Sequence, residues 1–167
     1  MESEINNFLP KKDFNEINNI INHIHYPWYV DAHHAETQKH FHFVHDFYHK
    51  DKDVRPKVDD YFYDIFYKKI SDQVGFKIKI LKARVNLFVK SSFKYLDYHQ
   101  DYKEGLSMLL YMEDSDGCTQ FQNGKTINSV ENKALFFNAN SIHRTVMQKN
   151  SFLRKNINVN FKEDIWK

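Results

Sequence analysis

Alternation of apolar and polar residues runs through the second half of this chain and limits the folds open to it. Residues 83–89 (ARVNLFV) and 153–161 (LRKNINVNF) carry apolar side chains at every second position for most of their length, the period of a strand with one buried face. Residues 106–112 (LSMLLYM) are apolar throughout, as in a strand buried on both faces. Turn signals such as Asn123-Gly124 separate these stretches, and no helical pattern intervenes. The pattern predicts an antiparallel sandwich or jelly roll.

The last of these stretches has two faces of opposite character. Ile157, Val159 and Phe161 form an apolar face, and Arg154 lies on the other face with three asparagines at every second position after it. Buried polar groups need hydrogen-bonding partners, so the second face makes poor core. We interpret it as the wall of a cavity. The alternative is that this face is simply exposed to solvent.

Helical periodicity is confined to residues 1–75. Apolar residues recur at helical spacing between Phe14 and Ile24, after Asp13-x-x-Glu16, which resembles a capping box. A second helix is predicted from about residue 58, with an end near Gly75. Both helices are expected to pack outside the sheet. The predicted fold class is therefore α+β, mainly β: one domain over 1–167, with a jelly-roll (double-stranded β-helix, cupin-like) core in 76–161.

Composition agrees with a single folded domain. The 167 residues are long enough for one buried core, and with 41% hydrophobic and 16% aromatic residues the chain is not disordered. No apolar run approaches the roughly 18 residues of a membrane-spanning helix, and the first residues show no signal-peptide pattern. The single cysteine, Cys118, excludes an internal disulfide framework and favours a reducing cytoplasm.

Charge is unevenly distributed along the chain. Residues 1–49 carry three Lys/Arg and seven Asp/Glu, a net of −4, whereas residues 50–94 carry twelve and six, a net of +6. A basic segment can attract nucleic acid or acidic substrates. The interpretation that we prefer is a solvated face, because the lysines are scattered, as at positions 77, 79 and 82.

A His-x-Asp motif followed by a distant histidine predicts a metal site. His99 and Asp101 lie between two predicted strands, and His143 follows at the start of another. Two imidazoles and one carboxylate on one face of a metal, with open positions opposite, form the ligand set of non-haem Fe(II) oxygenases. A second His-x-Asp begins at His49, but its charged, proline-containing surroundings are typical of a loop. We therefore select His99, Asp101 and His143.

An arginine in the last predicted strand is a candidate anion-binding residue. Arg154 follows His143 along the chain, and a guanidinium can form a bidentate pair with the carboxylate of a co-substrate. Arg144 is the rival. In a strand it would point opposite to His143, and we therefore favour Arg154.

Residues 84–161 resemble the catalytic core of the 2-oxoglutarate/Fe(II)-dependent oxygenases. The closest similarity in style is to small prolyl-hydroxylase-like members found in bacteria and marine bacteriophages. The order and spacing of several motifs carry the resemblance, which covers roughly half of the chain. The matching features are Asn86, His99-Gln100-Asp101, LSMLLYM, Gly117-Cys118-Thr119-Gln120-Phe121, His143, and Arg154 with Asn156.

The resemblance implies an activity, cofactors and roles for residues. His99, Asp101 and His143 would hold Fe(II), and Arg154 would bind the 5-carboxylate of 2-oxoglutarate. With O2 as the oxidant and 2-oxoglutarate as the co-substrate, a C–H bond of a peptidyl or small-molecule substrate would be hydroxylated, with release of succinate and CO2. Many relatives carry a cofactor-binding tyrosine where Phe88 stands here. The residues that could replace it or otherwise contact the cofactor are Asn86, Tyr98, Tyr111 and Asn156.

Aromatic and histidine residues crowd the segments 26–29 and 40–49. We interpret them as the wall of a substrate entrance, formed by Trp28, Tyr29, Phe43 and His45. Aromatic residues that merely cover the sheet are an equal alternative. A second metal site through His45 and His49, at helical i, i+4 spacing, is a weaker possibility because no recognisable cysteine or acidic partner accompanies them.

Two other functions remain open at this point. A nucleic-acid oxidative demethylase of the same chemistry is not favoured: Arg154-x-Asn156-x-Asn158 is similar to its Arg-x-Asn-x-Thr, but Asn160 stands where a second arginine is needed. A non-catalytic jelly-roll binding protein has no need of the three ligands together with Arg154. The expected location is the cytoplasm, or the host cytoplasm if the protein is viral.

Overall fold

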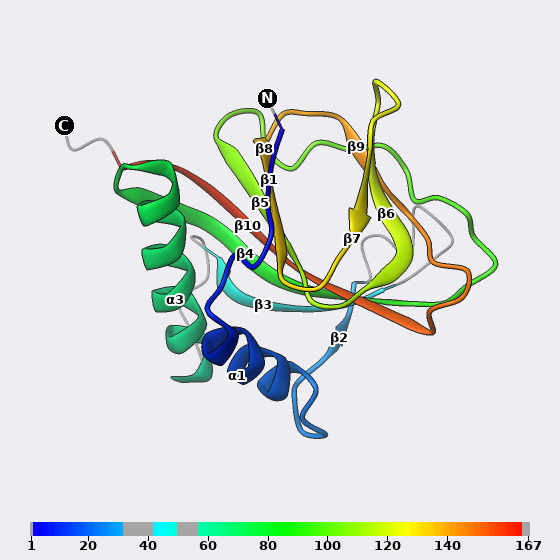
Figure 1. Cartoon of the computed structure of the whole chain (residues 1–167), viewed down its shortest axis with the longest axis horizontal. Coiled ribbons are helices and arrows are strands. Elements are labelled where there is room, and N and C mark those ends of the chain that lie inside the picture. The colour runs from blue at the N-terminus through cyan, green and yellow to red at the C-terminus, as the bar shows by residue number, and fades with distance from the viewer. Residues whose placement is uncertain (1, 32–41, 50–56, 165–167) are drawn as a thin grey trace.

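A computed structural model describes residues 2–31, 42–49 and 57–164, except for the side chains of 57–59 (Figure 1). Ten strands and two helices are assigned in these ranges. The N-terminal elements are β1 (Ser3–Ile5), α1 (Lys11–Ile21), β2 (Tyr29–Val30), β3 (Phe43–His49) and α3 (Lys57–Val74). The remaining strands are β4 (Ile78–Val89), β5 (Leu106–Tyr111), β6 (Ser115–Phe121), β7 (Thr126–Ser129), β8 (Lys133–Asn138), β9 (His143–Val146) and β10 (Leu153–Glu163).

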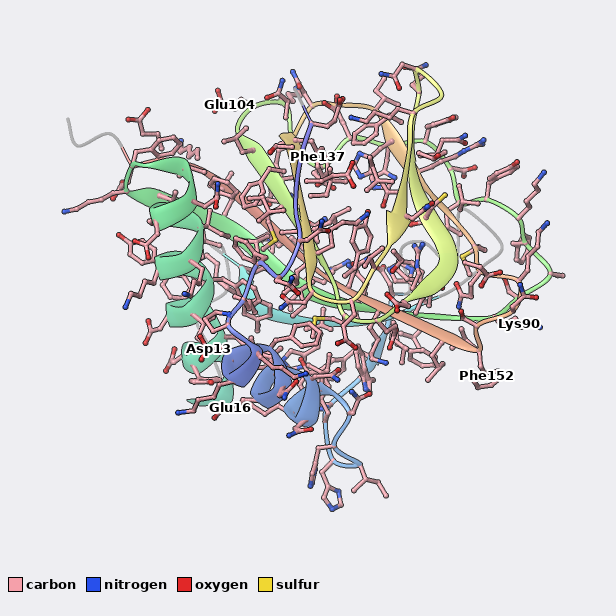
Figure 2. All side chains as sticks on the ribbon, in the orientation of Figure 1. Asp13, Glu16, Lys90, Glu104, Phe137 and Phe152 are labelled. Atoms are coloured by element: carbon pink, nitrogen blue, oxygen red, sulfur yellow. The ribbon has the colours of Figure 1, made fainter. Side chains whose placement is uncertain are left out.

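The strands form two antiparallel sheets that face each other. The large sheet has the order β1-β8-β5-β10-β4-β3-β2, and the small sheet has the order β7-β6-β9. An apolar cluster joins them, in which Leu109 and Phe137 of the large sheet pack with Phe121 and Ile127 of the small one. Phe137 is labelled between the sheets in Figure 2. The predicted mainly β jelly-roll fold is confirmed.

The main hydrophobic core lies on the opposite face of the large sheet. Ile157, Val159 and Phe161 of β10 pack there with buried residues of both helices, including Phe14 of α1 and Phe66 of α3. Both helices cover this face of the sheet (Figure 1). The predicted apolar face of β10, and the position of the helices outside the sheet, are therefore confirmed.

The helix ends differ in how well they were predicted. Helix α3 ends at Val74, and Gly75 follows with φ +79° and donates its N–H to the Ser71 carbonyl at 3.0 Å, as expected for a glycine C-cap. Helix α1 begins after Pro10 with no side-chain capping bond, so the predicted capping box is wrong. The labelled Asp13 and Glu16 lie within that helix (Figure 2).

Three strands of the N-terminal part were not predicted. Strand β1 has three residues and β2 has two, too few to show a period. Strand β3 pairs with β4, but its alternation is broken by an irregularity between Asp46 and Tyr48. A β-bulge of this kind shifts the side chains that follow it to the other face, which hides the strand from a search for period two.

No helix in the described part of the chain has the length and apolar character needed to cross a membrane.

Candidate metal centre

Backbone pairing brings the two histidines of the predicted ligand set together. His99 lies between β4 and β5, and its N–H donates to the carbonyl of His143, at the start of β9, at 2.9 Å. The N–H of His143 returns a bond of 2.9 Å to the carbonyl of His99. The imidazole centroids are consequently 4.5 Å apart. Asp101, two residues further on, is held by its own N–H, which donates to the Ala139 carbonyl at 3.0 Å.

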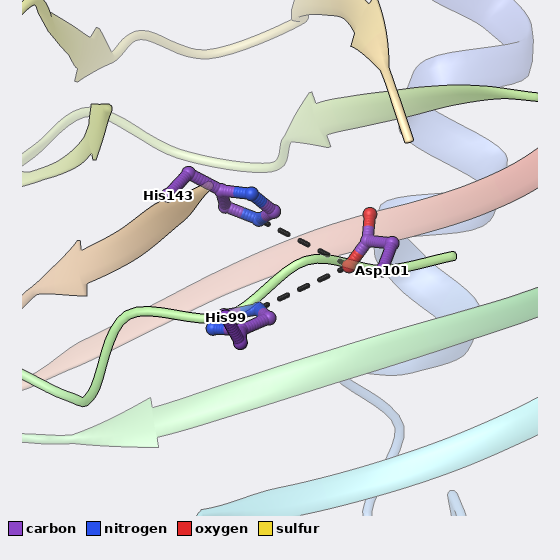
Figure 3. Close-up of side chains that lie close together, drawn as sticks. All are labelled: His99, Asp101 and His143. Atoms are coloured by element: carbon purple, nitrogen blue, oxygen red, sulfur yellow. Dashed lines mark ion pairs between the residues drawn. The ribbon is translucent and has the colours of Figure 1, made fainter. Parts of the chain in front are cut away.

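The three side chains converge on one point (Figure 3). Nε2 of His99 and Nε2 of His143 each lie 3.9 Å from Oδ1 of Asp101, and the three ligand atoms lie within 4.8 Å of one another. Atoms about 2.1 Å from a common ion at right angles are roughly 3 Å apart, so small side-chain rotations complete the set. In the part of the chain that the structure describes, no other group of three such side chains meets this criterion.

The hydrogen bonds of the two Nδ1 atoms indicate the tautomer of each imidazole. Nδ1 of His99 lies 3.2 Å from the Asp97 carbonyl, and Nδ1 of His143 lies 2.9 Å from the Ser141 carbonyl. A carbonyl only accepts, so each Nδ1 carries the hydrogen and each Nε2 presents a lone pair toward Asp101. Burial holds the pKa of His143 below its usual value, although Asp101 opposes this shift, and favours the neutral form that binds metals.

The two oxygens of Asp101 have different surroundings. Oδ2 accepts hydrogen bonds from the Ser107 hydroxyl at 2.6 Å and from the Asn160 amide at 2.9 Å. The Asn158 amide lies 3.4 Å from both oxygens. Oδ1 faces the two imidazoles. Because Oδ2 is already held by two short hydrogen bonds, the carboxylate presents one oxygen to a metal.

A cavity of about 330 Å³ opens beside this centre, between the two sheets. Its wall includes all three ligands and the asparagines 156, 158 and 160 of β10. Asn156 and Asn160 are each only 4% exposed, so the alternative of a solvent-exposed face is wrong, and the predicted cavity wall is confirmed for the three asparagines. Strand β4 adds Lys82, Arg84, Asn86 and Phe88 to the lining.

Arg154 is a buried cation with unused hydrogen-bond donors. Its exposure is 0%; Nη1 donates to the Val146 carbonyl at 3.3 Å, while Nε and Nη2 have no partner among the described residues. Burial lowers its pKa, but a guanidinium stays charged in proteins. Arg154 is not itself part of the cavity wall; Phe88, whose ring centroid lies 5.1 Å from its Cζ, is.

The glycine of the Gly-Cys-Thr-Gln-Phe segment makes room for this arginine. A Cβ added to Gly117 would lie 2.8 Å from Nη1 of Arg154 and 3.0 Å from the Val146 carbonyl oxygen. The unpaired Nε and Nη2 donors of Arg154 fit an anionic ligand.

The guanidinium of Arg144 already has hydrogen-bonding and stacking partners, on the other side of β9. Its Nε and Nη2 donate to Oε1 of Gln120 at 2.9 and 2.7 Å. Its guanidinium also stacks on Tyr95 and Tyr98, whose ring centroids are 3.8 and 4.3 Å from Cζ. These contacts favour Arg154 over Arg144 as the residue that binds a co-substrate.

The residues that could replace the cofactor-binding tyrosine of many relatives lie in different parts of the structure. Asn86 lines the cavity and donates to Oδ1 of Asn156 at 2.8 Å. Tyr98 is 41% exposed and outside the cavity wall. The buried Tyr111 hydroxyl donates to Thr119 at 2.9 Å, and burial raises the pKa of Tyr111 to about 12. Asn86 and Asn156 are therefore the candidates that reach the cavity.

The predicted entrance residues lie elsewhere in the structure. None of Trp28, Tyr29, Phe43 and His45 is part of the cavity wall. His45 is buried, with Nδ1 2.9 Å from the Pro27 carbonyl, and it belongs to a strand, so helical i, i+4 spacing to His49 is wrong. His42 and His49, which sequence reasoning did not select as wall residues, line the cavity instead. The rest of the competing His-x-Asp motif, residues 50 and 51, lies outside the described residues.

Comparison with known proteins identifies the fold. No family model matches the sequence, and no curated protein matches it. An oxidoreductase of the 2OG-Fe(II) oxygenase family from Burkholderia pseudomallei superposes with a TM-score of 0.75 at 9% identity, over 96% of this chain and 85% of that chain. The viral collagen prolyl hydroxylase of Paramecium Bursaria Chlorella virus-1, solved as a 2OG complex, superposes with a TM-score of 0.62 at 14% identity, over 96% of this chain and 94% of that chain.

A third structure widens the range of chemistry found on this fold. The non-heme alpha ketoglutarate dependent epimerase SnoN from nogalamycin biosynthesis gives a TM-score of 0.72 at 10% identity, over 97% of this chain and 76% of that chain. At such low identities the likeness establishes the fold. The chain has the double-stranded β-helix fold of the 2OG-Fe(II) oxygenases, and the resemblance seen in the sequence is confirmed at that level.

Proposed function

We propose that this protein is an Fe(II)- and 2-oxoglutarate-dependent oxygenase. The observation that carries the proposal is the convergence of two imidazole Nε2 atoms on one oxygen of Asp101, on the fold of such enzymes. His99, Asp101 and His143 would hold the iron on one face. Bound Fe(II) and 2-oxoglutarate supply the oxidising chemistry, which consumes O2 and releases succinate and CO2.

The residues of this chain orient the reactants. Arg154 pairs with the distal carboxylate of 2-oxoglutarate, because its buried charge and two free N–H donors match that group. Ser107 and Asn160 hold Asp101 so that one oxygen remains available to the metal. Asn86 and Asn156 add amide donors and acceptors to the cavity wall.

The reaction that we propose is hydroxylation of a C–H bond in a peptidyl or small-molecule substrate. Two similar structures are described as prolyl hydroxylases, which supports this choice. The epimerase shows that a protein of this fold can give another outcome. Product analysis is therefore part of the test.

Anaerobic titration tests the proposal directly. Fe(II) and then 2-oxoglutarate are added to the protein, and a weak visible charge-transfer band is expected from their chelate. His143→Ala should abolish the band, whereas Arg144→Ala should keep it, because Arg144 is engaged with Gln120. On admission of air, slow formation of succinate is expected. Binding without any succinate would favour a non-catalytic protein.

A further inference from the structure

A β-bulge turns Lys82 into the cavity. Strands β4 and β10 pair Asn160 with Lys82 and then Phe161 with Ile80, so Leu81 is an extra residue. Ile80 and Ala83 both lie in the core under the helices. With regular alternation, Lys82 would share the face of Ile80; the extra residue instead places it in the cavity wall.

Lys82 makes no hydrogen bond or ion pair among the described residues, and its side chain is only partly buried. Burial lowers its pKa, and Arg84 adds to that effect, while Asp46, Asp31 and Asp101 oppose it from a distance. A partly buried ammonium group gains free energy when a ligand supplies charged acceptors for its three donors.

The carboxylates nearest to Lys82 are already engaged. Arg84 binds Asp31 through Nη1 at 2.8 Å, and its Nε and Nη2 bind the two oxygens of Asp46. Asp101 is held by Ser107 and Asn160 and faces the histidines. These carboxylates cannot move to Lys82 without breaking the ion pairs of the partly buried Arg84 or dismantling the metal centre. An anionic molecule bound in the cavity, in place of water, is therefore the partner open to Lys82.

That molecule differs from the one next to Arg154. Lys82 pairs with Asn160, six residues along β10 from Arg154, so the two cations lie at opposite ends of the row of polar residues on this face. Asp101 is bonded to Asn160, so the metal centre lies close to the Lys82 end of the row. Lys82 thus lies in the cavity wall near the metal centre, whereas Arg154 is not part of that wall.

We propose that Lys82 binds a carboxylate of the primary substrate, which is a small carboxylic acid rather than an internal peptide residue. The proposal rests on the proposed function, since it takes the site of Arg154 to be that of 2-oxoglutarate. The cavity volume of about 330 Å³ matches small molecules. Lys82 thereby determines specificity by placing the substrate next to the metal centre.

Thermal shifts of the metal-free protein test the assignment without turnover. The probes are the free L-amino acids and the two- to six-carbon monocarboxylic acids, each beside its carboxamide, together with 2-oxoglutarate. At least one acid, and not its amide, should raise the melting temperature of the wild type. Lys82→Met should abolish this shift and keep that of 2-oxoglutarate, and Arg154→Met should do the reverse.

Steady-state assays provide the second readout and the controls. With the acid identified above, Lys82→Met should raise its KM by about tenfold to hundredfold, the value of a charge-assisted hydrogen bond, while the KM for 2-oxoglutarate stays within twofold. Lys82→Arg should retain most of the affinity. Lys79→Met, at an exposed position on the same strand, should change neither the KM for the acid nor the KM for 2-oxoglutarate.

Three results would overturn the assignment. They are the absence of any stabilising acid, an acid shift that survives in Lys82→Met, or an equal shift by the amide. If the wild type instead binds its acid through Lys82 but never forms succinate, the proposed function fails while the binding site stands.

Discussion

At the scale of single residues, Asp101 is the most constrained side chain of the centre. One oxygen is fixed by Ser107 and Asn160, and the other faces both histidines. This asymmetry prepares the carboxylate for a metal before any metal arrives. Partners of this kind typically contribute a factor of about 10 to 100 in metal affinity.

We predict that His99→Ala, Asp101→Ala and His143→Ala each abolish tight Fe(II) binding. Each substitution leaves only two of the three converging ligand atoms. Equilibrium dialysis with Fe(II) under anaerobic conditions measures the effect. Asp51→Ala, in the competing His-x-Asp motif, serves as the control and should bind iron normally. An equal loss of iron in that control would show that the wrong motif was selected.

Arg154→Met should have two opposite effects. The affinity for 2-oxoglutarate should fall by about 2–5 kcal/mol, because a carboxylate loses its charged partner in a buried site. The ligand-free protein should be as stable as the wild type or more stable, since an apolar side chain replaces a buried cation with unpaired donors. Isothermal titration and thermal denaturation measure the two effects. A larger binding defect in Arg144→Ala would assign the co-substrate to the other face of the small sheet.

At the scale of elements, regular strands were predictable and irregular ones were not. The faces of β10 follow period two without interruption from Arg154 to Asn160, and both were assigned correctly. Strand β3 was missed because a bulge interrupts it. The bulge at Leu81 likewise made the predicted environment of Lys82 wrong. From the sequence, Lys82 continues the series of lysines at 77 and 79 that we interpreted as solvated. A bulge is set by pairing with another strand, and this pairing leaves no periodic trace in the sequence.

The three converging side chains of the candidate metal centre were predictable for a different reason. His99, Asp101 and His143 needed only their residue types and flanking strands to be selected. Ser107 and Asn160, which orient Asp101, carried no such signal, because serine and asparagine are common and their role depends on which strands are neighbours. His42 and His49 were hidden in a segment with too many histidines to choose from.

Gly117→Ala is predicted to disturb the contact between β6 and β10. The new methyl group would lie 2.8 Å from Nη1 of Arg154 and 3.1 Å from the Gln148 nitrogen. Overpacking of this kind costs about 1–3 kcal/mol, and the displaced guanidinium should bind 2-oxoglutarate less well. Urea unfolding and titration with 2-oxoglutarate measure these effects. Unchanged affinity would mean that Arg154 does not need the space above the glycine.

Asp116 at the start of β6 is expected to make the turn before β10 sensitive to pH. The backbone N–H groups of Ser151, Asn150 and Lys149 donate to its carboxylate and hold its pKa well below its usual range. A carboxyl group whose pKa is lowered by folding stabilises the fold at pH values above its unfolded-state pKa of about 3.9. This contribution is lost as the pH falls from there toward the folded-state pKa.

Asp116→Asn should therefore be less stable than the wild type at pH 7, and the difference should shrink below about pH 4. Denaturant unfolding of both proteins across this range provides the comparison. A difference that is constant with pH would assign the effect to shape rather than to charge.

At the scale of the whole molecule, ligands that bind only the folded state should stabilise it. Mn(II), as a redox-stable substitute for Fe(II), and 2-oxoglutarate at about 100 times their dissociation constants should each add about 2.7 kcal/mol. Calorimetry with and without a chelator measures this stabilisation. In His143→Ala the contribution of the metal should disappear, while Arg144→Ala should retain it.

The two faces of the large sheet have different roles. One face packs against the helices through side chains such as Ile157 and Val159, and the other carries the row of polar groups that ends near the metal centre. We therefore expect that lineages of this protein can exchange a cavity residue such as Lys82, and so change the molecule that is bound, at little cost to the stability of the fold.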